Sequence, residues 1–97
     1  MNGYLSIHTM DGDPEALLAA KREHMDPVVS RLAPRHGALA SVTVAGDGGI
    51  TVYNIWRDAA GAAAFSREPE AQQAQQASGL PLPSSFSRHP DVEVTLY

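Results

Sequence analysis

The sequence predicts a single α+β domain in which strands and helices follow the order β-α-β-β-α-β. Four segments have the alternating or β-branched composition of strands. Two segments have helical character, and each follows an aspartate that can cap a helix. A glycine-rich turn joins the second and third strands as a hairpin. This order is the ferredoxin-like pattern, with one antiparallel sheet and both helices on one face.

The first strand is predicted over Tyr4 to Met10, where side chains alternate between two faces. Leu5 and Ile7 fall on one face, and His8 falls on the opposite, more polar face. Asp13 is then a plausible N-cap, and Pro14 suits the first helical position because its missing N–H is not needed there. The first helix therefore starts directly after this strand.

The first helix is predicted to kink or restart after Asp26, because Pro27 removes a backbone hydrogen bond and clashes with the preceding turn. Residues at helical spacing form its buried stripe, namely Leu17, Leu18, Met25, Val28, Val29 and Leu32. The outer face is predicted to carry Lys21, Arg22 and Glu23.

The second strand is predicted over Leu39 to Ala45, and Gly46 to Gly49 then turns the chain into a third strand from Ile50 to Trp56. One face of this third strand carries Ile50, Val52, Asn54 and Trp56. Since the first and third strands are antiparallel neighbours in this topology, Ser6 and His8 should approach Val52 and Asn54. The register remains open at this stage.

Asp58 caps the second helix, which begins in an alanine-rich run, contains Phe65 and is disturbed near Pro69 before it resumes through residues 71–77. Its glutamine-rich end predicts a peripheral position. Three prolines and several serines between Gly79 and Pro90 predict a loop, either a lid or a subunit contact, in which Phe86 offers an apolar surface. The last strand is predicted over Asp91 to Tyr97.

Composition restricts the possible partners. The 97 residues carry a net charge of -4 and no basic cluster, which argues against nucleic acid and against an anionic membrane surface. The chain has no cysteine, so thiolate metal sites and cysteine nucleophiles are excluded. No segment resembles a signal peptide or a membrane span, so a cytoplasmic location is the default expectation. Apolar residues on both faces of the strands predict a homodimer in which a second copy covers the helix-free face.

Asn54 is the polar residue that most needs explanation, because a buried amide without a partner costs about 1 to 3 kcal/mol. Its partner could be a bound ligand or a backbone group at a bulge. His8, with an unperturbed pKa near 6.5, suits a general base or a hydrogen bond to a ligand, although a half-exposed histidine at a sheet face is the plainer interpretation. Trp56 could line a cavity or simply close the core, and His24 borders the apolar stripe of the first helix.

The element order, the segment Tyr53-Asn-Ile-Trp-Arg-Asp58 and the alanine-rich helix containing Phe65 resemble the antibiotic biosynthesis monooxygenase family of dimeric α/β barrels. The resemblance implies a dimer with a ligand cavity between sheet and helices in each subunit. It also implies candidate activity as a cofactor-free monooxygenase on an aromatic or polyketide-like metabolite. Under this resemblance His8, Asn54 and Trp56 are the catalytic candidates, and the substrate-binding candidates are Phe65, Phe86 and His24.

Other functions remain open: a non-catalytic binding dimer, or a cyclase or isomerase of the same fold. In the haem-degrading branch of the family a histidine follows the positions that match Trp56 and Phe65, but here that position is Gln75, a poor axial ligand. No histidine and carboxylate pair has metal-ligand spacing, and no phosphate-binding loop is present, so neither a metal nor another cofactor is expected.

Overall fold

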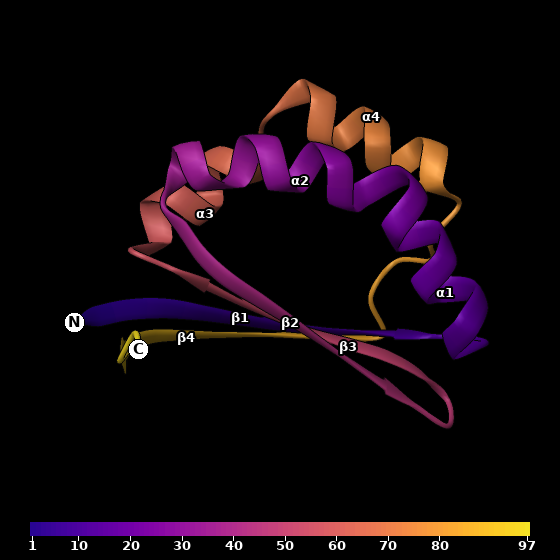
Figure 1. Ribbon diagram of the computed structural model, residues 1–97, viewed down its shortest axis with the longest axis horizontal. Helices are drawn as coiled ribbons and strands as arrows, with labels where there is room; N and C mark the ends of the chain where they lie inside the picture. Colours follow the sequence, from indigo (N-terminus) through magenta and orange to yellow (C-terminus); the bar gives the residue numbers. More distant parts are fainter.

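The computed structural model describes residues 1–97 and contains one four-stranded antiparallel sheet in the order β2-β3-β1-β4. The strands are β1 (Asn2–Asp11), β2 (Ala38–Gly46), β3 (Gly49–Trp56) and β4 (Ser85–Glu93). All helices lie on one side of this sheet (Figure 1). The predicted ferredoxin-like fold is therefore confirmed, with β1 and β3 as the central pair.

The first helical stretch arches over the sheet as four consecutive pieces (Figure 1). These are α1 (Pro14–Ala20), the π-helical turn η1 (Lys21–Met25), α2 (Asp26–Leu32) and the 3₁₀ turn η2 (Ala33–His36). Its predicted cap is confirmed, because the Asp13 carboxylate accepts a hydrogen bond from the Ala16 N–H at 2.9 Å.

Pro27 explains the π-helical turn. Proline cannot donate to the carbonyl four residues earlier and its ring clashes with that group, so the turn before it widens. In η1 the Asp26 N–H donates to the Lys21 carbonyl, five residues back. The same widening brings the Lys21 Nζ to 2.7 Å from the Asp26 carboxylate, and the Lys21 side chain is only 18% exposed. The prediction that Lys21 lies on the outer face is therefore wrong.

The second helical stretch consists of α3 (Ala59–Ser66) and α4 (Pro69–Ser78). Asp58 caps α3 as predicted, accepting from the Gly61 N–H at 2.7 Å. Gly61 is required by close packing, since a Cβ there would lie 1.9 Å from the His36 carbonyl oxygen. α4 packs on η1 and α2 rather than on the sheet, which confirms its predicted peripheral position.

The C-terminal part differs from the prediction, because strand β4 covers Ser85–Glu93. The segment predicted as a loop therefore ends at Ser84, and the segment predicted as the last strand leaves the sheet after Glu93. Serine and proline composition favoured a loop, but β4 is an edge strand, where Pro90 need not donate to a ladder. Asp91, at φ 61°, is the bulged residue between the partners of Gly3 and Tyr4.

The core between sheet and helices consists of two separate clusters. One contains Met10, Leu17, Ile50 and Val52. The other contains Tyr4, Ala33 and Trp56. Along β1 and β3 the positions between these clusters are polar, and they define the candidate site described below. None of the helices has both the length and the apolar character needed to span a membrane.

Candidate functional site

A row of four polar residues crosses the sheet from one edge to the other. The register pairs Ser6 of β1 with Asn54 of β3 on one side and with Arg88 of β4 on the other, and it pairs Asn54 with Ser41 of β2. The row faces the helices, because side chains two residues away on the same strands are buried against them: Tyr4, Val52 and Trp56. We call Ser41, Asn54, Ser6 and Arg88 the polar row.

The side chains of the polar row make no hydrogen bond within the chain. Ser6 is only 7% exposed, and its hydroxyl has no protein partner. Asn54 is half-buried and equally unpaired, and the alternative that it satisfies a backbone group at a bulge is not what the structure shows. Unpaired interior polar groups are costly, and a bound molecule would satisfy them.

His8 lies one step along β1 from Ser6, on the same face. It pairs with Val52 on one side and Phe86 on the other, and its imidazole stacks on the Phe86 ring with centroids 5.9 Å apart and planes 10° apart. Burial, and secondly the positive charge of Lys21, lower the pKa of His8 below 6.5. His8 is therefore neutral at pH 7 and able to accept a proton.

The effect of Lys21 on His8 can be tested directly. Replacing Lys21 with methionine removes the positive charge and keeps most of the aliphatic stem, so the pKa of His8 should rise. It should stay below 6.5, because burial is the larger cause and persists. NMR titration of the His8 ring measures this shift, with Arg22→Met on the exposed side of the same turn as the control. An unchanged His8 pKa in Lys21→Met would show that the lysine charge does not act there.

Titration of His8 also affects stability. A lowered pKa means that the unfolded chain binds more protons than the folded chain between the two pKa values. The free energy of unfolding therefore has its full contribution from neutral His8 above pH 6.5. This contribution decreases as pH falls from 6.5 through the folded-state pKa.

Trp56 lies at the other end of the same face, four residues along β3 from Val52, the residue opposite His8, or roughly 13 Å along the strand. It is 6% exposed and packs with Tyr4 and Ala33, and its ring centroid is 5.4 Å from that of Phe65. The indole Nε1 is buried and has no hydrogen-bond partner. The structure therefore brings His8 and Phe86 together, places Trp56 with Phe65, and leaves Asn54 between these two groups along the same face.

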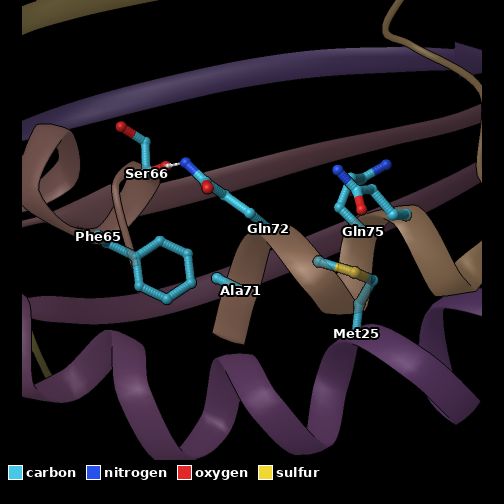
Figure 2. A pocket seen from close by; sticks show the side chains of 7 residues that line it. Met25, Phe65, Ser66, Ala71, Gln72 and Gln75 are labelled. Carbon is cyan, nitrogen blue, oxygen red and sulfur yellow. Dashed lines mark hydrogen bonds between the residues drawn. The ribbon is translucent and has the colours of Figure 1, made fainter. Parts of the chain in front are cut away.

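A pocket of about 380 Å³ lies beside Phe65 in the helical layer. Figure 2 shows the Met25 side chain from η1, the Phe65 ring from the end of α3 and two glutamines of α4 around it. The Gln72 side chain donates to the Ser66 carbonyl at 3.1 Å. The side-chain amide of Gln75 has no hydrogen-bond partner within the chain, although its backbone carbonyl accepts from the Ser78 hydroxyl at 2.6 Å. Apolar side chains and side-chain amides therefore both line this pocket.

His24, the remaining predicted binding residue, does not line this pocket. Its ring is half-buried and lies 3.8 Å from the Glu23 carboxylate. No group of three or more histidines, cysteines and carboxylates is arranged to hold a metal ion.

Three residues in the region of the site were not identified from the sequence. Lys21 was placed outward, although the proline six residues later could have indicated a widened turn. Arg88 fell within a presumed loop, and only the strand register places it beside Ser6. His36, which was not singled out from the sequence, forms a hydrogen bond with the Glu68 carboxylate at 2.8 Å and contacts the Phe65 ring edge-on. That bond ties η2 to the connection between α3 and α4.

Comparison with known proteins gives similarity in structure only. No family model matches the sequence, and no curated protein matches it significantly. A monooxygenase from the ActVA-Orf6 gene of Streptomyces coelicolor, solved with nanaomycin D, superposes with a TM-score of 0.75 at 15% identity, covering 99% of this chain and 93% of that one. SnoaB, a cofactor-independent oxygenase from Streptomyces nogalater, gives a TM-score of 0.66 at 11% identity, covering 96% and 94%.

A dimeric ferredoxin-like protein from an uncultured marine organism gives a TM-score of 0.65 at 11% identity, covering 100% of this chain and 92% of that one. Identities this low establish the fold and leave the activity open. The chain has the ferredoxin-like fold of a group of structures that includes antibiotic biosynthesis monooxygenases.

Proposed function

We propose that this protein is a small-molecule enzyme that oxidises an aromatic or polyketide-like substrate without a cofactor. The observation that carries the proposal is the pair of unpaired polar side chains, buried Ser6 and half-buried Asn54, beside His8, a neutral and half-buried base. The fold shared with a cofactor-independent oxygenase supports it.

In the proposed reaction His8 accepts the proton of a phenolic hydroxyl, and the Asn54 amide donates a hydrogen bond to the resulting oxyanion. The electron-rich substrate anion then reduces oxygen itself. For a ring carbon that carries two hydrogens, one oxygen atom becomes the new carbonyl, and the other leaves as water with those two hydrogens. The substrate supplies all the electrons, so the balance requires only molecular oxygen.

The proposal also assigns ligand contacts to aromatic side chains around the site. Phe86, 48% exposed, presents its ring beside His8 and can contact an aromatic ligand. Phe65 contributes an apolar wall to the pocket in the helical layer. In this proposal Trp56 binds the ligand through its unpaired indole N–H, because its ring already packs against Phe65.

Oxygen uptake with hydroxylated anthrones, together with mass spectrometry of products formed under ¹⁸O₂, tests the activity. One labelled oxygen atom per turnover, at a rate above the enzyme-free control, supports an oxygenase. Conversion that continues without oxygen would instead indicate a cyclase or isomerase. Saturable binding without conversion would indicate a non-catalytic binding protein.

We also propose that the protein forms a homodimer through the helix-free face of the sheet. On this face β1 and β3 present Leu5, Ile7, Tyr53 and Ile55, and β2 presents Val42 and Val44, which are 55% and 50% exposed. A contiguous apolar sheet face of this kind is typical of a protein interface. A structurally similar protein is described as dimeric.

Replacing Val44 with lysine should weaken this dimer, because a charge would be buried where two apolar faces meet. Light scattering coupled to size exclusion should show the wild-type chain at twice 10.3 kDa and the variant shifted toward the monomer. Ala63→Lys, on the exposed side of α3, is the matched control and should remain dimeric. A monomeric wild-type chain would contradict the proposed interface.

A further inference from the structure

We propose that Arg88 makes the site selective for aromatic ligands that carry an anionic group, a carboxylate or an ionised phenol, at the end opposite the reacting oxygen. This inference rests on the proposed function and specifies the substrate class of that site. It follows from the charges on the helix-facing side of the sheet, from the contacts of Arg88, and from its distance to Asn54 along the polar row.

The helix-facing side of the sheet carries cations and no anions. Between the Tyr4–Trp56 pair and the Met10–Ile50 pair, none of the helix-facing residues of the sheet is acidic. Lys21, which approaches this face from η1, is already paired with Asp26 at 2.7 Å. Arg88 makes no salt bridge with any carboxylate. Arg88, an exposed residue of the edge strand, thus has no ion-pair partner within the chain and lies opposite the buried residue Ser6.

The guanidinium of Arg88 is held in place by an aromatic ring. Its central carbon lies 4.5 Å from the centroid of Phe86, a cation–π contact that leaves the N–H groups at the edge of the guanidinium plane. Phe86 in turn stacks on His8. Arg88, Phe86 and His8 therefore form a continuous surface along β4 and β1 on which a flat ligand can lie. Guanidinium groups recognise carboxylates by two parallel hydrogen bonds, which fixes ligand orientation as well as adding affinity.

The spacing of the polar row fits a ligand with two polar ends. Arg88 and Asn54 lie two strand intervals apart across the sheet, roughly 10 Å. This is about the long dimension of a three-ring system. A ligand whose anionic group meets Arg88 would pass over Ser6 and place an oxygen at the far end near Asn54. The hydroxyl of Ser6, a residue that is 7% exposed, has no partner in the chain and would then bond to a polar group in the middle of the ligand.

The test compares two probes with the same ring system: 1,8-dihydroxyanthraquinone with a carboxylate at position 3, and the same compound with a methyl group there. Binding is measured by calorimetry to the wild-type protein, to Arg88→Gln and to Arg67→Gln. Arg67 lies at the C-terminal cap of α3, away from the polar row, so its variant makes the same charge change elsewhere.

We expect the wild-type protein to bind the carboxylate about tenfold or more tightly than the methyl compound, with a preference that declines as salt is added. Arg88→Gln should lose this preference while keeping its affinity for the methyl compound, and Arg67→Gln should keep the preference. Equal binding of the two probes to the wild type, or a preference that survives in Arg88→Gln, would overturn the inference and leave the proposed oxygenase standing. If neither probe binds, the site itself is refuted, and the inference falls with it.

Discussion

Replacing Asn54 with leucine is expected to lower kcat of the proposed oxidation by about 100-fold or more, while leaving the protein as stable as the wild type or more stable. The activity should fall because a positioned donor to a developing oxyanion contributes on the order of 10² to 10³ in rate. Stability should not fall, because the Asn54 side chain makes no hydrogen bond within the chain and the other β3 residues on its face, Ile50, Val52 and Trp56, are apolar. Replacing an unpaired interior amide with an apolar group of similar size removes a desolvation cost.

This opposite response of activity and stability separates a ligand-binding role from a structural one. Oxygen-uptake kinetics give kcat, and chemical denaturation gives the free energy of unfolding. Ser41→Ala, at the exposed β2 end of the polar row, is the control and should change both quantities little. An Asn54→Leu variant that loses more than about 1 kcal/mol of stability would show that the amide stabilises the fold. Unchanged turnover would remove Asn54 from the reaction.

The parts of the fold that could be predicted from sequence are those set by local chemistry. Asp13 with Pro14, and Asp58 before the alanine run, mark the two helix starts that the structure has. The glycines from Gly46 to Gly49 mark the hairpin that joins β2 to β3. In each case one side chain or one turn determines the conformation of its own neighbours, so distant residues are not needed.

The start of β4 could not be predicted, because that strand depends on its partner. Ser85, Ser87 and Pro90 have little preference for strands, yet these residues pair with β1 along its full length. Without β4, β1 would have an unpaired edge, and because β4 is itself an edge strand, Pro90 need not donate a hydrogen bond. Tertiary pairing thus overrode local composition.

Only part of the candidate site could be predicted, because the remaining residues are placed by pairing between strands. Alternation alone put His8 and Asn54 on definite faces, and the topology made their strands neighbours. The polar row required the register, since a shift of one residue would have moved every side chain to the other face. Arg88 could not be placed without it, and Lys21 required the π-helical turn that Pro27 induces. Both cations near His8 therefore became apparent only in three dimensions.

Trp56 could line the substrate cavity or only fill the core, and these two roles predict different effects when the residue is replaced. Truncation to alanine should cost about 3 to 5 kcal/mol in the free energy of unfolding, because a 6%-exposed indole packed on Phe65 and Tyr4 would leave a large cavity. In a 97-residue domain that is a large share of the total stability. Circular dichroism is the appropriate probe, since the chain has no other tryptophan to report unfolding by fluorescence.

Trp56→Phe distinguishes the roles of the ring and of its N–H group. The substitution keeps an aromatic ring against Phe65 but removes the buried Nε1–H, which has no partner in the chain. Loss of volume destabilises, whereas removal of an unpaired donor stabilises by about 1 to 3 kcal/mol, so the net change should be much smaller than for alanine. If the indole N–H binds the substrate, this stable variant should nevertheless lose turnover. If Trp56 only fills the core, Trp56→Phe should be as active as the wild type, and the active site would then be confined to the half of the sheet that carries His8 and the polar row.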